Sequence, residues 1–314
     1  MKISTCIGGA PVGEMEQFAY LKELGFDACD FALGKYFYPK KGIYCDIDNV
    51  TDEQIKEHFT ALRKAAEACD FEIGQTHSEF CGHPRQYDFN LDDLLKREIA
   101  CVKATHYLGC KYMVVHPIIK PGRRYDLLVK EAFDEAADFY RKLIPYLEKY
   151  DVYCCVENMW VCDPVYRHIC STIFSHAQEM VDMCDLLGER FKICLDVGHC
   201  TLTQDDPVEA VRICGDKLAV LHTHDNGGWA DTHAMPFQAF GNPVGVKAMR
   251  IDWDAFMKAL KEVDYKGNLS FELVPPGPVE LRRDGFIYLK EMADYMVSVF
   301  DNYDPNAEEN AEEE

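Results

Sequence analysis

Several common sequence signals are missing from this chain of 314 residues. There is no run of 18 or more apolar residues, so a membrane-spanning helix is not expected. The fifteen cysteines include no C-x-x-C pair, a spacing typical of zinc and dithiol sites. No G-x-G-x-x-G follows the first strand-like run and no Walker pattern occurs, so neither common phosphate-binding loop is expected. The first residues, MKISTCIGG, lack the long apolar stretch of a signal peptide and fit a first strand.

Basic residues are scarce, with 33 Lys and Arg against 54 Asp and Glu and a net charge of −21. Such a chain repels polyanions on average, so nucleic acid is not an expected partner. Seven of the acidic residues fall between Asp301 and Glu314. We expect residues 1–300 to form the folded domain and 301–314 to be an acidic, disordered tail.

Many cysteines lie in apolar stretches, among them Cys154, Cys155 and Cys194. This placement fits reduced, buried thiols better than a disulfide framework. Because the cytosol keeps thiols reduced, the sequence predicts a cytoplasmic protein.

Strand-like runs alternate with helix-like segments eight times. The expected strands are Lys2–Ile7, Phe26–Asp30, Phe71–His77, Lys111–His116, Val152–Glu157, Lys192–Asp196, Leu218–His222 and Asn268–Glu272. Amphipathic segments with i, i+3, i+4 apolar spacing lie between them, for example Asp52–Cys69, Leu91–Leu108, Asp126–Lys149 and Asp252–Val263. Asp52 and Asp252 are expected to be helix N-caps.

This alternation predicts an α/β fold, a single-domain (β/α)8 TIM barrel. A doubly wound open sheet is the alternative, although it lacks a glycine-rich phosphate turn here. Two smaller domains would also fit the length, but no linker-like stretch divides the chain. Two loops are long for a barrel, 31–50 with its cluster of aromatic residues and 225–251 with Gly, Pro and Phe. Loops of this length often form lids or binding loops, and the first is a candidate for a lid or subunit contact.

Four polar residues close short apolar runs that are expected to be strands. They are Glu157 in VYCCVE, Asp196 in FKICLD, His222 in LAVLH and Glu272 in LSFE. The ends of parallel barrel strands meet at one rim, where barrel enzymes hold their chemistry. Carboxylate and imidazole ligands together suit Mn, Mg, Co, Zn or Fe. We therefore expect a divalent metal site at this rim.

Seven of the eleven histidines lie at or just after expected strand ends: His77, His83, His116, His199, His222, His224 and His233. Because strand residues alternate faces, His222 and His224 should point the same way. Each candidate also has a plainer interpretation. Asp196 is also suited to a turn and His199 to the surface. His116 is also suited to a place in the core.

The remaining candidates are open to similar alternatives. Glu157 is also suited to an ion pair with a neighbouring barrel lysine. Glu272 is also suited to a purely structural role at the end of a strand before a Pro-Pro turn. Asp231 and His233, in ADTHAMP, fit metal ligands or loop hydrogen bonds equally well. Three aromatic residues suit stacking on a sugar or ordinary packing: Trp160, Trp229 and Phe237. The group is stronger evidence than any member, because all candidates fall at one end of one barrel.

The motifs VENM, LDVGH, HTHDN, DTH with a following Pro, and IDWDAF…DYKGNLSFE occur in this order. By these motifs, and by its eight-unit layout, the chain resembles the xylose isomerase-like TIM-barrel superfamily. That superfamily contains sugar isomerases and epimerases, inosose dehydratase-like enzymes and endonuclease IV. The resemblance is densest from His116 to Glu272.

The resemblance to the ketose epimerases implies one divalent metal ion (Mn, Co, Mg or Zn) with four ligands: Glu157, Asp196, His222 and Glu272. It also implies that the two glutamates act as acid and base on either face of the substrate carbon. His199 matches a histidine that contacts a substrate oxygen, and His116, His224 and Trp160 are further candidates for substrate contact. The epimerases typically carry an Arg shortly after the histidine of strand seven. Here HDNGGWADTH has none, so substrate contacts must differ.

The resemblance to endonuclease IV implies a different metal content. It adds further ligands to the same four, namely His77, His116, His199, Asp231 and His233. Three clustered zinc ions would activate water against a phosphodiester. The negative charge and the lack of obvious basic DNA-binding loops weigh against this activity.

The sequence as a whole predicts a metal-dependent sugar isomerase or epimerase that acts through an enediolate. Its expected partner is a small sugar or polyol, with no membrane and no nucleic acid, and the family resemblance favours a homo-oligomer. The alternatives are a polyol dehydratase of the inosose type on the same site and a three-zinc phosphodiesterase. A non-catalytic sugar-binding barrel is a third class, which need not keep both glutamates.

Overall fold

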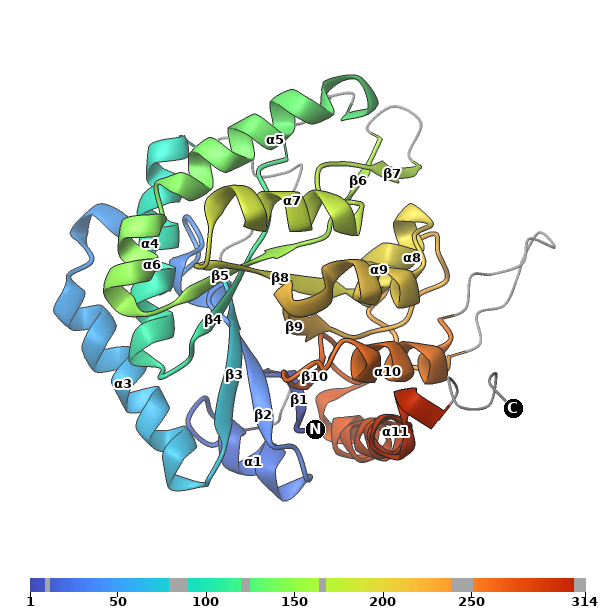
Figure 1. Cartoon of the computed structure of the whole chain (residues 1–314). Helices are drawn as coiled ribbons and strands as arrows, with labels where there is room; N and C mark the ends of the chain where they lie inside the picture. The colour runs from blue at the N-terminus through green and yellow to red at the C-terminus, as the bar shows by residue number, and fades with distance from the viewer. Residues whose placement is uncertain (9–11, 79–89, 120–124, 164–167, 239–250, 308–314) are drawn as a thin grey trace.

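A ring of parallel strands forms the centre of the molecule (Figure 1). The structure is a computed structural model, and it describes residues 1–8, 12–78, 90–119, 125–163, 168–238 and 251–307. The strands are β1 (Ile3–Cys6), β2 (Ala28–Ala32), β3 (Glu72–His77), β4 (Tyr112–Val115), β5 (Tyr153–Glu157), β8 (Phe191–Asp196), β9 (Leu218–His222) and β10 (Leu269–Phe271). They pair in the order β10-β1-β2-β3-β4-β5-β8-β9. A parallel bridge between Thr223 and Phe271 links the two ends of this order. Each strand overlaps one of the eight expected runs, although β2 continues two residues past Asp30 and β8 begins one residue early, so the (β/α)8 barrel is confirmed and the open sheet is wrong.

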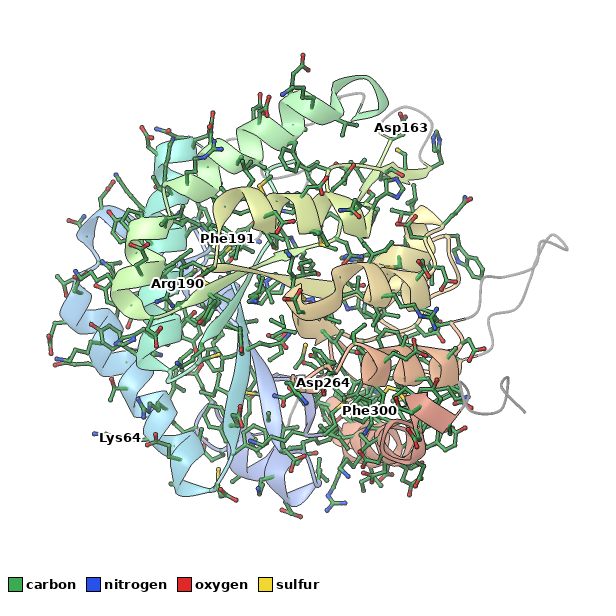
Figure 2. The ribbon with its side chains drawn as sticks, in the orientation of Figure 1. Lys64, Asp163, Arg190, Phe191, Asp264 and Phe300 are labelled. Carbon is green, nitrogen blue, oxygen red and sulfur yellow. The ribbon has the colours of Figure 1, made fainter. Side chains whose placement is uncertain are left out.

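Helices surround the ring of strands (Figure 1). They are α1 (Gln17–Glu23), α2 (Gly34–Phe37), α3 (Asp52–Ala68), α4 (Leu91–Tyr107), α5 (Tyr125–Arg141), α6 (Ile144–Tyr150), α7 (Ala177–Leu187), α8 (Val197–Thr203), α9 (Pro207–Cys214), α10 (Trp253–Glu262) and α11 (Arg282–Asn302). Short 3-10 turns are η1 (Ile47–Asn49), η2 (Gly215–Lys217) and η3 (Val279–Leu281). Among the described residues, no helix has the length and apolar character needed to cross a membrane. Polar side chains such as Lys64 on α3 point outward (Figure 2).

Some expected boundaries are wrong for local reasons. The segment expected as one helix over Asp126–Lys149 is two helices, because Pro145 stands in the first turn of α6 and cannot donate the hydrogen bond that would continue α5. An antiparallel hairpin, β6 (Trp160–Cys162) with β7 (Ile169–Ser171), was not expected. Helix α11 reaches Asn302, two residues into the segment expected as a tail, and residues 308–314 lie outside the described part.

The two helix caps expected from sequence have different outcomes. Asp252 caps α10, where its side chain accepts a hydrogen bond from Ala255 N at 3.0 Å. Asp52 is instead the first residue of α3, because Thr51 takes the cap position. Thr51 and Gln54 form a capping box, in which each side chain bonds to the backbone N–H of the other residue.

Two separate apolar layers reflect the alternation of strand residues. The layer between strands and helices is large and rich in aromatic residues, with Phe18, Phe59 and Phe256 fully buried. The layer inside the barrel is a small cluster of four residues, Val114, Cys155, Cys194 and Val220. These four lie two positions before the polar strand-end residues His116, Glu157, Asp196 and His222. Since side chains alternate with period two, the polar set stands directly above this apolar floor.

The cysteines that the structure describes are all free, and most are buried. Burial raises the pKa of Cys155 well above its ordinary value and that of Cys110 to about 12. These thiols are therefore protonated, inert core residues at neutral pH, as the sequence predicted.

The aromatic loop after β2 packs into the protein body. Tyr36 and Phe37 are 1% and 0% exposed, and Tyr44 stacks on Phe37 with 5.8 Å between ring centroids. The expectation that this aromatic cluster forms a lid or subunit contact is therefore wrong for the two buried rings. Arg97 of α4 holds the loop by donating hydrogen bonds to the carbonyl oxygens of Phe37 and Cys45.

Replacing Arg97 by Met is expected to destabilise the fold by roughly 2–4 kcal/mol, because two carbonyl acceptors lose their donor in a buried setting. Urea unfolding followed by circular dichroism measures this loss. Arg63→Met is the matched control, since Arg63 forms an exposed i, i+4 pair with Glu67 that is worth about 0.5 kcal/mol or less. Equal effects of the two substitutions would contradict the role of Arg97.

Candidate metal centre

Four side chains that the sequence singled out converge at the C-terminal ends of the strands. Glu157, Asp196 and His222 are the last residues of β5, β8 and β9, and Glu272 directly follows β10. Each offers one ligand atom, and these four atoms lie within 4.8 Å of one another. A shift in the β8–β9 register, from the pair Ile193–Leu218 to the pair Cys194–Val220, contributes to this arrangement because it sets Asp196 directly opposite His222.

One nitrogen of His222 faces the three carboxylates. Its Nδ1 lies 2.9 Å from Glu157 Oε1, 3.5 Å from Glu272 Oε2 and 4.0 Å from Asp196 Oδ2. Three carboxylates and one imidazole thus surround a single small volume. This is the donor set that hard and borderline divalent ions prefer.

Burial makes this cluster of acids costly without a compensating cation. Glu157, Asp196 and His222 are all 0% exposed. Burial favours neutral carboxyls, but His222 and His116 hold the pKa of Glu157 well below its ordinary value, and His199 and His224 lower that of Asp196. Burial raises the pKa of Glu272. Buried negative charges need a partner cation or proton, so the residues present fit a divalent ion.

Two further histidines lie on the other side of Glu157. His116 Nε2 is 2.8 Å and His77 Nε2 is 3.4 Å from Glu157 Oε2. Burial lowers the pKa of His116. Burial acts the same way on His77, but its interaction with Glu157 prevails and raises the pKa to about 9. His77, Glu157 and His222 form a second group with metal-ligand spacing, and His83 lies outside the described residues.

A third group surrounds Asp231, in the loop after β9. Its Oδ2 lies 3.2 Å from His199 Nε2 and 3.3 Å from His233 Nε2. Burial alone would lower both histidine pKa values, but Asp196 and Asp231 raise the pKa of His199 well above its ordinary value. The hydrogen bond to Asp231 raises that of His233 to about 10. Asp231 is thus a half-buried acid that lies between two imidazoles.

His224 joins the groups together. Its Nε2 is 3.1 Å from Asp196 Oδ2, and its ring stacks on His233 with 4.2 Å between centroids. Both His222 and His224 therefore face Asp196, as their spacing predicted. Asp196, His199 and His224 form one group with ligand spacing, and His224, His233 and Glu272 form another.

Gly198 leaves the space that His224 occupies. A Cβ at Gly198 would lie 2.0 Å from the ring carbon Cε1 of this buried histidine. Gly198→Ala is therefore expected to displace the ring and to lower stability by about 1–3 kcal/mol, measured by urea unfolding. Gly34→Ala is the control, because nothing lies within 4 Å of a Cβ there. Equal stability of the two variants would contradict the close fit.

Sequence reasoning missed two residues that support the centre. Asn158 accepts a hydrogen bond from Asp196 N at 2.7 Å and donates to Asp196 O at 2.8 Å, while its own carbonyl lies 2.8 Å from His199 Nδ1. Asp30 lies 2.8 Å from His222 Nε2. The strand expected over Phe26–Asp30 ends at Asp30, but β2 continues through Phe31 and Ala32, so the strand-end pattern that found the other acids does not describe Asp30.

The aromatic candidates differ in their relation to the centre. Trp160 on β6 meets the ring of His199 edge-on, with 6.5 Å between centroids. Trp229 is 52% exposed in the loop after β9. Phe237 contacts Trp253 and Tyr295, neither of which belongs to a group with ligand spacing. The structure thus brings Trp160 into contact with the candidate site residue His199.

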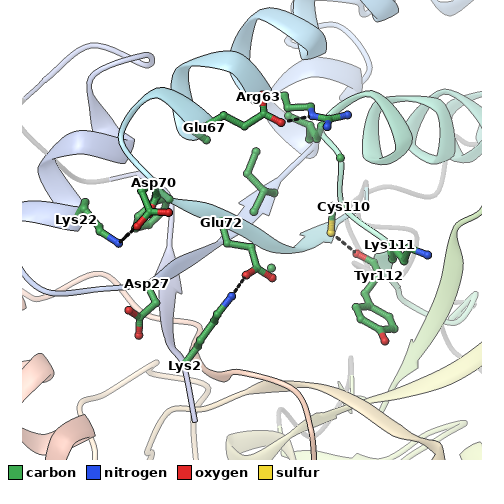
Figure 3. A pocket seen from close by; sticks show the side chains of 16 residues that line it. Lys2, Lys22, Asp27, Arg63, Glu67, Asp70, Glu72, Cys110, Lys111 and Tyr112 are labelled. Carbon is green, nitrogen blue, oxygen red and sulfur yellow. Dashed lines mark hydrogen bonds and ion pairs between the residues drawn. The ribbon is translucent and has the colours of Figure 1, made fainter.

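A cavity of about 640 Å³ lies at the opposite end of the barrel, around the first residues of β3 and β4 (Figure 3). Six of its charged residues are paired with one another: Lys22 with Asp70 at 3.2 Å, Arg63 with Glu67 at 2.7 Å, and Lys2 with Glu72. Lys111 pairs with Asp151 at 3.1 Å, and Asp27 accepts a hydrogen bond from Ile3 N. Chemistry in this fold belongs to the C-terminal face, so we assign the function to the carboxylate and histidine groups instead.

Comparison with known proteins identifies the family and similar folds. The family model described as xylose isomerase-like TIM barrel matches residues 18–292. The uncharacterized protein MJ1311 of Methanocaldococcus jannaschii is 25% identical over 174 residues, 54% of this chain and 53% of that protein. The chain spans 53% or less of the length of the curated relatives that it matches.

Two solved structures illustrate the likeness in fold. A D-tagatose 3-epimerase-like protein has a TM-score of 0.69 at 17% identity, over 96% of this chain and 98% of its own. The IolI protein, described with a bound zinc atom, has a TM-score of 0.66 at 17% identity, over 97% of this chain and 100% of its own. With the family model matched over most of its length, this chain belongs to the xylose isomerase-like TIM barrel family.

Proposed function

We propose that this protein is a divalent-metal-dependent sugar isomerase or epimerase that transfers a proton through an enediolate intermediate. The observation that carries the proposal is the convergence of Glu157, Asp196, His222 and Glu272, whose ligand atoms lie within 4.8 Å of one another. Similar folds, described as a D-tagatose 3-epimerase-like protein and a D-psicose 3-epimerase, support the reaction class. The substrate would be a small sugar or related polyol with a carbonyl group.

The two glutamates have environments that suit opposite roles. A bound divalent ion, one of Mn, Co, Mg or Zn, would polarise the substrate carbonyl and stabilise the negative charge on its oxygen. In the loaded protein the positive charge of the ion would keep Glu157 ionised against the effect of burial, so this carboxylate can accept the proton from the carbon next to the carbonyl. Burial raises the pKa of Glu272, so this group carries a proton more readily and can return it.

The place to which the proton returns decides the product. Return to the same carbon from the opposite face inverts its configuration, and return to the adjacent carbon gives an isomer. Asp196 and His222 complete the ligand set in this proposal. His199, His116, His224 and Trp160 would contact substrate hydroxyls and the C–H face of the sugar. Loss of water instead of proton return would make the same centre a dehydratase of a cyclic polyol.

Solvent deuterium exchange tests the proposal without knowledge of the substrate. Metal-loaded protein is incubated in D₂O with a panel of ketohexoses, pentuloses and inososes, and NMR follows the proton next to the carbonyl. Exchange with at least one ketose, lost after chelation and restored by the ion, is expected. A product lighter by one water identifies a dehydratase. Absence of exchange over the whole panel with loaded protein would count against the proposal.

A three-metal phosphodiesterase is the second candidate, because three further groups have ligand spacing: His77 with Glu157 and His222, Asp196 with His199 and His224, and His224 with His233 and Glu272. Elemental analysis of protein purified without added metal or chelator separates the two. About one ion per chain supports the isomerase. Near three zinc ions per chain, together with cleavage of an abasic DNA duplex, would replace it with hydrolysis.

A further inference from the structure

Asp30 is a buried carboxylate that lies against the far side of His222. It stands on β2 and is 3% exposed, and its Oδ2 lies 2.8 Å from His222 Nε2. The other ring nitrogen, Nδ1, faces Glu157 at 2.9 Å and Glu272 at 3.5 Å. The imidazole is thus held between the candidate ligand cluster and one additional acid.

The strand register places Asp30 there. Cys29 pairs with Ile73, but the next pair is Asp30 with Gln75, so the β2–β3 ladder skips Gly74. Such irregularities occur next to active sites, where they redirect a side chain. Gln75 Nε2 donates to Asp30 Oδ2 at 3.0 Å and to Leu221 O at 3.2 Å. The carboxylate is therefore tied to the strand that carries His222.

This contact has a chemical consequence for His222. A neutral imidazole has one N–H donor and one acceptor nitrogen, and a carboxylate can only accept. With Asp30 as acceptor, the hydrogen of the neutral ring belongs on Nε2, and the Nδ1 lone pair is directed at the three carboxylates. Partners of this kind fix the tautomer and orientation of metal-binding histidines and increase their basicity.

We propose that Asp30 is a positioning residue that orients His222 for metal binding through Nδ1. This inference rests on the metal centre of the proposed function. A purely structural role does not explain the arrangement well, because Asp30 Oδ1 is buried without a hydrogen-bond partner among the described residues. A buried carboxylate with one unsatisfied oxygen lowers the stability of the fold. A role in orienting the ligand His222 explains why such a residue is present.

The test compares Co²⁺ binding by the full chain and three variants at one fixed pH. Asp30→Leu removes the acceptor, and Asp30→Asn is nearly isosteric and keeps an acceptor oxygen. Asp27→Asn is the matched control, because Asp27 lies just before the same strand and accepts from Ile3 N at 2.9 Å, away from the centre. Competition with a chelator gives the affinity, the visible spectrum reports the geometry of bound Co²⁺, and thermal melting reports the fold.

Asp30→Leu is expected to weaken Co²⁺ binding by about 10- to 100-fold and to change the spectrum. The Co²⁺ affinity of Asp30→Asn should lie between that of Asp30→Leu and that of the unchanged chain. The affinity of Asp27→Asn should equal that of the unchanged chain. If both Asp30 variants had the same Co²⁺ affinity and the same spectrum as the unchanged chain, the inference would be overturned, even if their melting temperatures were lower. If the unchanged chain itself bound no Co²⁺, the proposed metal centre would fail, and this inference with it.

Discussion

Glu157→Gln is expected to reduce the ketose exchange activity by more than about 10³-fold while the barrel remains folded. The substitution removes the charge that His116 and His222 contact at 2.8 and 2.9 Å, and it also removes the proposed proton acceptor. Loss of a general base alone costs about 10²–10⁴-fold in rate. Exchange in D₂O, metal content per chain and circular dichroism together measure the effect.

Glu179→Gln is the matched control for this change. Glu179 lies on α7 and accepts a hydrogen bond from Phe174 N at 2.7 Å, outside the ligand groups. It should keep metal content and exchange activity near those of the unchanged chain. If Glu157→Gln kept full activity, neither the ligand role nor the acid–base role of Glu157 would survive. Loss of metal together with loss of folded signal in that variant would point to a structural role.

The fold followed from local patterns because each pattern is repeated eight times. Every expected strand is present, since a short apolar run between amphipathic helices has few other uses in an α/β chain. The misassigned cap at Asp52 was avoidable, because T-x-x-Q at Thr51 is itself a capping signature. The split of the helix at Pro145 was also readable from sequence.

The candidate site was less readable, because pairing between strands decides which residues meet. The skipped residues Gly74 and Ala219 set Asp30 opposite Gln75 and Asp196 opposite His222. Without the second shift, Asp196 would stand opposite Leu221. The identity of Gly74 or Ala219 does not predict such a register shift, because the shift arises from the fit of neighbouring strands. Glu157 and Glu272 were found because acids that end apolar runs have few structural uses.

Metal affinity is expected to rise steeply with pH between about pH 6 and pH 8. Burial lowers the pKa of His222, but the Glu272 and Glu157 carboxylates around it and the hydrogen bond to Asp30 raise the value well above the ordinary one. The pKa of His199 is raised as well, by Asp196 and Asp231 against the effect of burial. Raised pKa values mean that protein stripped of metal holds protons on these rings at neutral pH. A divalent ion must displace each proton from a ring that it binds.

Each displaced proton changes the affinity by about tenfold per pH unit. The sign is fixed, because protons compete better at low pH and binding weakens as pH falls. Titration calorimetry in buffers of different ionisation enthalpy counts the protons released, and chelator competition at pH 6, 7 and 8 gives the affinity. His176→Gln is the control, since His176 pairs with Asp205 at 3.0 Å on the surface and should leave the proton count unchanged.

The proton count also separates the two candidate functions. One ion at Glu157, Asp196, His222 and Glu272 takes its single imidazole from His222, so release should be about one proton from histidine plus any held by Glu272. Further ions around Asp231 would release additional protons from His199 and His233, whose pKa values are raised. A pH-independent affinity with no proton release would mean that the ion binds elsewhere, because each imidazole-containing ligand group among the described residues includes a histidine within 4 Å of a carboxylate.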